Sequence, residues 1–302
     1  MNDLPLFSDK LDDAASLPPQ KNLELTLDEV GLENVQSQVQ VQGLLLPAKS
    51  DASVSLIDKN ARGIHMSRLF KIVSRMHEQE LTWPWLLSCL EQMLVSHDSL
   101  SDAAKLQVSF ELPVLRKALL SQEQGWRSYP LTYRVSSLKN KRVLSLTAKV
   151  LYSSTCPCSA GLSRQALQEQ LRNEFPEPQV QMEQILNYLA KPNAIVAVPH
   201  AQRSEAICEF TIDPEESIPP PLTLIDEMEN ALGTPVQAAV KREDEQEFAR
   251  RNAQNLMFCE DAARKLKAAF LKRDDLADFK IEVRHFESLH PHDVFARVSK
   301  NT

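Results

Sequence analysis

The sequence is poor in glycine, in long apolar runs and in net positive charge, and each shortage excludes a class of protein. Six glycines in 302 residues exclude a glycine-rich or collagen-like architecture. No apolar run reaches the roughly 18 residues that a membrane-spanning helix needs, so we expect no membrane partner. With 34 Lys and Arg against 41 Asp and Glu, the net charge is −7. That charge argues against a nucleic-acid partner but leaves room for a local basic pocket that binds a phosphorylated small molecule.

Cysteine is also sparse, with five residues. The N-terminal segment is acidic and contains proline, and it lacks the basic and apolar regions of a signal peptide. We therefore expect a cytoplasmic location and reduced thiols. Clustered cysteines are then better interpreted as catalytic or metal-ligating residues than as disulfides.

The apolar pattern of the first half predicts a mixture of strands and helices. Alternation predicts a strand hairpin over 36–57 with its turn at 47–51. Three- and four-residue spacings predict helices over 66–76 and 83–97. Further strands are expected at 105–112, 131–136 and 142–153. This order favours an α+β fold with helices on one face of an antiparallel sheet.

The second half predicts a similar set of elements. We expect helices at 163–174, 179–189, 222–232 and 256–271, and strands at 205–212, 280–286 and 294–298. The chain is long enough for one large domain or two ordinary ones.

Two thiols flank one proline in Cys156-Pro157-Cys158-Ser159, after a predicted strand. A structural zinc site usually needs a second cysteine pair, which this chain lacks. A catalytic metal needs only three protein ligands, and one cysteine with a histidine and a carboxylate supplies them. The alternative is that both thiols are incidental.

Three histidines in two later segments are further candidates. His200 precedes a strand, where a histidine is commonly a surface residue or a hydrogen-bonded one. His290 and His292 would point to one face of an extended segment, an arrangement suited to a metal or to proton transfer. Two solvated loop histidines are the other interpretation.

The segment around His65 begins the first predicted helix. Lys59, Arg62 and Arg68 place cations near that helix N-terminus, which could bind a polyphosphate. Acidic residues such as Glu245 and Glu260 say little by themselves in an acidic protein.

Taken together, six short motifs in order resemble those of GTP cyclohydrolase IB, the prokaryotic type of GTP cyclohydrolase I. They are GIHMSR (63–68), CPCS (156–159), HAQRS (200–204), KREDEQEF (241–248), FCED (258–261) and FESLHPHD (286–293). The resemblance implies a tunnelling fold (T-fold), with two tandem modules of antiparallel sheet and helices on one face. We accordingly expect a flexible leader at 1–22, a first module at 23–153 and a second at 154–302.

The resemblance also implies hydrolysis of GTP to 7,8-dihydroneopterin triphosphate and formate, the first step of folate biosynthesis. It implies a homotetramer with active sites at subunit interfaces and a divalent metal: zinc, or else manganese or iron. By motif, Cys156, His200, Glu245 and His290 are the expected metal-site residues, and Cys156, His200 and His290 the catalytic ones. Cys158 is expected to be auxiliary. Glu260, His65, Arg68 and His292 are the expected substrate-binding residues, with Glu260 anchoring the guanine.

The sequence departs from the family pattern between CPCS and HAQRS, which a short turn joins in the family. A long segment separates them here, and we interpret about 162–192 as an inserted helical hairpin. Two alternatives remain open. One is the T-fold NADPH-dependent nitrile reductase of queuosine biosynthesis, which needs an activated cysteine and no metal. The other is a non-catalytic paralogue that only binds pterin or metal.

Overall fold

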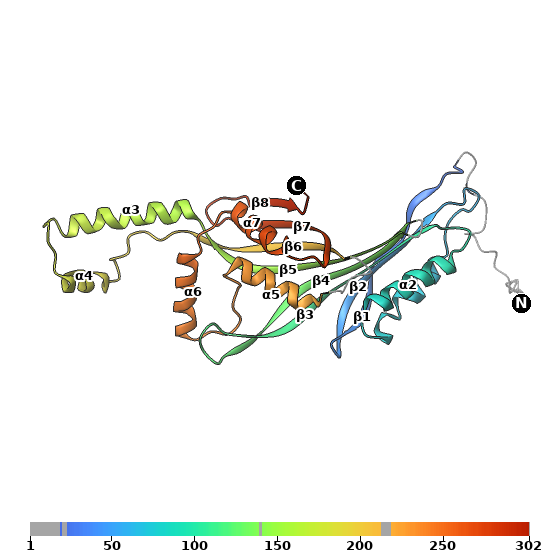
Figure 1. The fold of residues 1–302 in the computed structure, drawn as a ribbon, viewed down its shortest axis with the longest axis horizontal. Coiled ribbons are helices and arrows are strands. Elements are labelled where there is room, and N and C mark those ends of the chain that lie inside the picture. Colours follow the sequence, from blue (N-terminus) through green and yellow to red (C-terminus); the bar gives the residue numbers. More distant parts are fainter. Residues whose placement is uncertain (1–18, 20–22, 139–140, 213–218, 302) are drawn as a thin grey trace, which may run out of the picture. The chain divides into compact units, whose positions relative to one another are not determined.

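The computed structural model describes residues 19, 23–138, 141–212 and 219–301. The predicted leader at 1–22 lies outside these residues, apart from Pro19. In the described part of the chain, eight strands are hydrogen-bonded in sequence order, from β1 to β8 (Figure 1). The pairs β1–β2, β2–β3, β6–β7 and β7–β8 are antiparallel. The chain is therefore α+β, as predicted.

The chain forms two compact units, one of residues 1–111 with 132–145 and one of 112–131 with 146–302. This division differs from the predicted module boundary at 153 because three long strands contribute residues to both units. They are β3 (Ala103–Lys117), β4 (Gln124–Leu138) and β5 (Lys141–Thr155).

The first unit begins with the hairpin of β1 (Leu27–Val41) and β2 (Leu44–Leu56). Its turn is at Gln42 and Gly43, which both have positive φ (53° and 76°), as a two-residue hairpin turn requires. The predicted turn at 47–51 is wrong. Those residues belong to β2, where Pro47 pairs with Gln38.

Helices in the first unit are α1 (Met66–Val73) and α2 (Trp83–Ser96), with the short 3-10 helix η2 (Met76–Glu78) between them. Both predicted helices are confirmed. Thr82 caps α2 by accepting from the Trp85 N–H at 3.3 Å, and Pro84 is tolerated in the first turn. The apolar faces are buried, with Leu69 and Leu86 fully enclosed.

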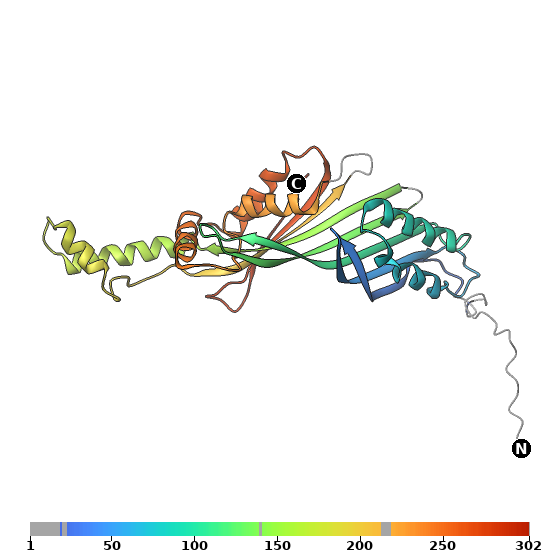
Figure 2. The ribbon, with the colours of Figure 1, turned by 90° about the horizontal axis from the view of Figure 1, so that it is seen from below.

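In its described residues, the second unit has five helices and three further strands. The helices are α3 (Pro157–Glu174), α4 (Met182–Leu189), α5 (Pro221–Leu232), α6 (Arg242–Gln254) and α7 (Cys259–Phe270), and the strands are β6 (Ala201–Ile212), β7 (Leu276–His285) and β8 (Val294–Ser299). Phe270 of α7 packs between Phe210 and Phe279 of the sheet, with ring centroids 4.7 and 6.0 Å away. These aromatic contacts fix α7 on one face of the sheet (Figure 2).

Helices α3 and α4 form an arm that extends away from the sheet of the second unit (Figures 1 and 2). The rings of Phe175 and Tyr188 meet edge to face at 5.6 Å and hold the two helices together. Leu162, Met182 and Leu186 are exposed. The segment at about 162–192 therefore contains α4 and most of α3, which begins earlier than predicted. That this segment is an inserted hairpin stays a prediction.

None of the helices in the described part of the chain is both long and apolar enough to cross a membrane.

Candidate active site

Cys156 and His200 lie side by side although a long segment of chain separates them. The Cys156 N–H donates to the His200 carbonyl at 3.3 Å, and the His200 N–H donates to Ser159 Oγ at 3.1 Å. Cys156 is the N-cap of α3 and is half-buried, whereas Cys158 is exposed. The base of the arm therefore brings together two of the four residues that the sequence predicts as metal ligands, Cys156 and His200.

A chain of polar groups determines which nitrogen of His200 carries the proton. Gln202 Nε2 donates to Glu287 Oε1 at 3.3 Å, because a carboxylate only accepts. The Gln202 carbonyl oxygen consequently faces His200 Nδ1 at 3.0 Å, and Nδ1 donates to it. A second Glu287 oxygen lies 3.8 Å from the same nitrogen. We assign the lone pair of the neutral imidazole to Nε2, the nitrogen left for a metal or a proton.

Glu245 lines a cavity of about 340 Å³ in the second unit. Gln202, Tyr152 and Val236 line the same cavity, so Glu245 and the amide that orients His200 face a common space. Glu245 belongs to the first turn of α6.

A buried polar cluster lies where β5 approaches this site. The Tyr152 hydroxyl and His285 Nε2 are 2.8 Å apart, and the Ser154 and Ser204 hydroxyls are 2.8 Å apart. Burial lowers the pKa of His285 to about 4, so the ring is neutral near pH 7. All four side chains of the cluster are buried.

His290 and His292 lie in the loop between β7 and β8, and both are exposed. Their rings are stacked, with centroids 5.0 Å apart and planes inclined by 14°. The two imidazoles therefore share one side of the loop, as the spacing predicts. Glu260 is the second residue of α7 and is exposed.

His65 and Arg68 belong to the first unit. His65 is the N-cap residue of α1, and its ring centroid lies 6.3 Å from that of the fully buried His97. The Arg68 guanidinium donates to the Ser96 carbonyl near the C-terminus of α2. The guanidinium thus joins the two helices at the surface of this unit.

The comparison with known families covers nearly the whole chain. The model of the family described as "Type I GTP cyclohydrolase folE2" matches residues 11–296. The chain belongs to this family.

Relatives in the family are similar over most of their length. GTP cyclohydrolase FolE2 of Pseudomonas putida (strain GB-1) is 45% identical over 270 residues, which cover 89% of this chain and 90% of that protein. The FolE2 of Pseudoalteromonas translucida (strain TAC 125) is 42% identical over 277 residues, covering 90% and 91%. The family resemblance predicted from the six motifs is confirmed.

Solved structures with the same fold are much more distant in sequence. Uricase from Arthrobacter globiformis has a TM-score of 0.52 at 6% identity and covers 90% of this chain and 93% of its own. Urate oxidase from Bacillus sp. TB-90 has the same TM-score at 9% identity, covering 90% and 98%. Together with the eight-stranded antiparallel sheet, this likeness identifies the T-fold architecture that the sequence predicts.

The donor types at the FolE2 motifs suit a divalent metal. Thiolate, imidazole and carboxylate are ligands that zinc accepts, and His200 presents Nε2. The Thr155 hydroxyl, beside Cys156, is buried and has no hydrogen-bond partner in the described part of the chain. Within the same part, no three His, Cys, Asp or Glu side chains of one chain are grouped so as to hold a metal. The residues fit by chemistry, and the single chain does not assemble them into a complete ligand set.

Gln202 and Glu287 are the site residues that sequence reasoning missed. Both lie inside the motifs HAQRS and FESLHPHD, in which the histidines are the more obvious candidates. An amide in the same motif as a candidate histidine, together with a carboxylate in another motif, could have indicated side chains that orient that histidine.

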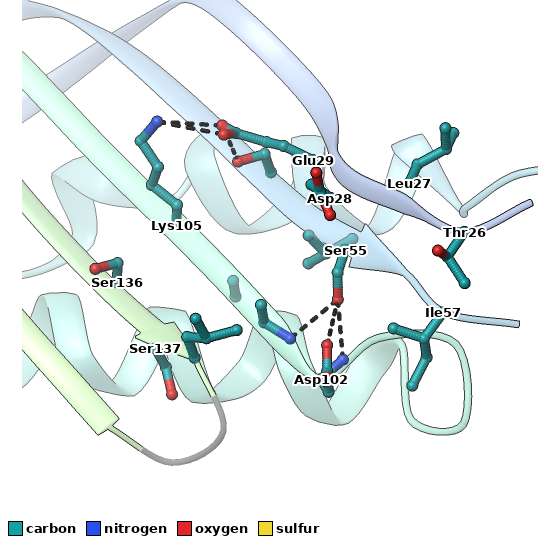
Figure 3. Close-up of a pocket in the computed structure, with 15 residues that line it drawn as sticks. Thr26, Leu27, Asp28, Glu29, Ser55, Ile57, Asp102, Lys105, Ser136 and Ser137 are labelled. Carbon is teal, nitrogen blue, oxygen red and sulfur yellow. Dashed lines mark hydrogen bonds and ion pairs between the residues drawn. The ribbon is translucent and has the colours of Figure 1, made fainter.

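The first unit has a cavity of about 580 Å³ that none of the predicted site residues lines. Figure 3 shows that several of its polar groups are paired with one another. Ser55 donates to the Asp102 carboxylate at 2.9 Å, and Glu29 accepts from Ser53 at 2.7 Å and from Lys105 at 3.2 Å. We do not assign the active site to this cavity.

Proposed function

We propose that this chain hydrolyses GTP to 7,8-dihydroneopterin triphosphate and formate, the first step of folate biosynthesis. The observation that carries the proposal is the family match over residues 11–296, supported by relatives named GTP cyclohydrolase FolE2. The reaction takes place in the cytoplasm under this proposal.

The proposal includes a divalent metal (zinc, manganese or iron) held by Cys156, His200, Glu245 and His290. A bound divalent metal supplies Lewis acidity, which makes water a better nucleophile near neutral pH. The hydrogen bond from His200 Nδ1 to Gln202 supports a ligand role for His200, because it keeps the proton away from Nε2.

Proton transfer is assigned to His200 and His290, since imidazole is the side chain suited to general acid–base catalysis. Substrate binding is assigned to groups outside the ligand set, among them His292, whose ring is stacked on that of His290. Glu260 can accept from the N1–H and the 2-amino group of guanine, a bidentate contact that adenine does not offer. His65 and Arg68 would bind the triphosphate.

We propose that four copies form a homotetramer in which neighbouring copies complete each site. Two observations support a site shared between copies. The described residues of one chain contain no complete metal-ligand group. The strand order also leaves β1 and β8 as the edges of the sheet, where backbone groups can pair with another chain.

The decisive experiment measures formate released from GTP by the purified protein, with and without a chelator and without NADPH. Formate release that chelation abolishes and added metal restores is the expected result. Reduction of a nitrile substrate with NADPH, without formate release from GTP, would establish the nitrile reductase instead. Binding of pterin or metal with neither activity would identify a non-catalytic paralogue.

A further inference from the structure

Asp244, the residue before Glu245, is fully buried and accepts four hydrogen bonds. Three donors belong to the turn between β3 and β4: the N–H groups of Leu120 and Ser121, at 2.7 and 3.0 Å, and the Ser121 hydroxyl at 2.6 Å. The fourth is the N–H of Lys241, the N-cap of α6, at 2.8 Å. These bonds hold the pKa of Asp244 well below its ordinary value, so the carboxylate stays charged.

Capping of the helix alone would need only the bond to Lys241. Asp261 occupies the equivalent third position of α7 and shows what a plain cap looks like. It accepts from the Phe258 N–H at 3.1 Å, and its other partner is the exposed Arg264. The three extra donors to Asp244 come from a different element, so its carboxylate joins α6 to the β3–β4 turn.

The segment that leads into α6 is fixed at two earlier points as well. The Ser153 N–H donates to the Thr234 carbonyl at 2.9 Å, and the Val236 N–H donates to the Leu151 carbonyl at 3.2 Å, so this segment runs beside β5. Further along, Gly125 of β4 lies so close to the segment that an added Cβ atom would be only 2.6 Å from the Ala238 Cβ. Strand β4 therefore packs directly on the segment. Asp244 is the last of these attachments before Glu245.

We propose that Asp244 is a positioning residue that fixes where Glu245 enters the cavity it shares with Gln202. Its carboxylate holds the first turn of α6 on the β3–β4 turn, so the backbone that carries Glu245 cannot rotate or slide. The inference rests on the proposed role of Glu245 as a metal ligand.

The test is a titration of metal-free full-length protein with Zn²⁺ against a chromophoric chelator. Asp244→Asn keeps the size of the side chain but leaves the Lys241 N–H or the turn facing an amide nitrogen. We expect its zinc affinity to fall roughly 10-fold or more, in the range seen when groups that orient metal ligands are lost. Ser121→Ala removes one donor and keeps the carboxylate, so a smaller fall is expected. That second variant carries the test if Asp244→Asn does not fold.

A double-mutant cycle separates positioning from general stability. In a Glu245→Gln background, Asp244→Asn should change zinc affinity no further, because the ligand that it positions is gone. Glu123→Gln is the matched control. It removes the exposed 3.0 Å ion pair between Glu123 and Lys241 at the same junction, and zinc affinity should stay at the wild-type value.

The possible failures are distinguishable. If Glu245→Gln binds zinc like wild type, the ligand assignment of the proposed function is wrong, and the positioning role falls with it. If Glu245→Gln weakens binding but Asp244→Asn does not, or if the loss persists unchanged in the double variant, only the positioning role is overturned.

Discussion

Replacing Gln202 with leucine should weaken metal binding without unfolding the protein. The variant keeps the side-chain volume close to that of glutamine and removes both groups that link His200 to Glu287. His200 Nδ1 then loses its 3.0 Å acceptor, and the Glu287 carboxylate loses its amide donor. The imidazole is free to rotate and to place its proton on either nitrogen.

The size of the effect follows from the role of such partners. Loss of a group that orients a metal-binding histidine costs about 10- to 100-fold in affinity, or roughly 1.4–2.7 kcal/mol. The lower end is favoured here, because Glu287 Oε2 already lies 3.8 Å from Nδ1 and can move to accept its proton. We therefore expect a loss near 10-fold for Gln202→Leu, and a larger loss when Glu287→Gln is added.

Competition with a chromophoric chelator measures zinc affinity, and circular dichroism checks that the fold is kept. Gln165→Leu is the matched control, because it removes a 3.2 Å amide–carboxylate bond to Glu169 on the exposed face of α3. Wild-type zinc affinity in a folded Gln202→Leu variant would refute the assigned orientation of His200.

Four further predictions address other residues. Cys156→Ala should abolish metal retention and turnover, whereas Cys158→Ala, at an exposed position, should leave measurable turnover. Equal loss of metal in the two variants would show that the roles of the two cysteines are misassigned. Replacing residues 162–192 with a short linker should leave a folded, metal-binding protein, because Tyr188 is the one buried side chain in that fully described segment. An insoluble or metal-free product would show that the segment belongs to the core. Glu260→Gln should lower kcat/KM for GTP by at least about 100-fold at unchanged metal content, since it disrupts two charge-assisted hydrogen bonds of about 1.5–3 kcal/mol each. Loss of metal together with normal GTP binding would contradict the role of Glu260 as the guanine anchor. Burial lowers the pKa of His285 from 6.5 to about 4, so the unfolded chain binds the proton first as pH falls, and the free energy of unfolding should drop between pH 6.5 and 4 by about 3 kcal/mol at most. In urea unfolding, the free energy of His285→Gln should depend less on pH than that of wild type, and parallel pH curves would exclude His285 as the cause.

The order and type of most elements could be predicted because each has a clear apolar period. The helix that begins near Met66 and the strand that ends near Thr155 both follow such patterns. The first hairpin turn was misplaced because Pro47 and Asp51 are typical turn residues, whereas the actual turn depends on the backbone of Gln42 and Gly43. Local composition does not reveal which residues adopt positive φ.

The site was predictable only as far as residue types in motifs allow. The motifs identified Cys156 and His200, and the structure places their backbones in contact. The roles of Gln202 and Asp244 depend on partners far away in the sequence, Glu287 and Ser121, which only the fold brings near. Long-range hydrogen bonds leave no periodic signal in a single sequence.

The base of the arm has a consequence for how this protein can be modified. Hydrogen bonds from Cys156 to His200 and from His200 to Ser159 tie together the two points where the arm joins the sheet of the second unit. The arm can therefore open or fray locally without pulling on the site, since local unfolding of a peripheral segment costs far less than global unfolding. Its apex near Pro176 is a natural position for a fluorescent label or an inserted peptide tag that leaves the chemistry undisturbed.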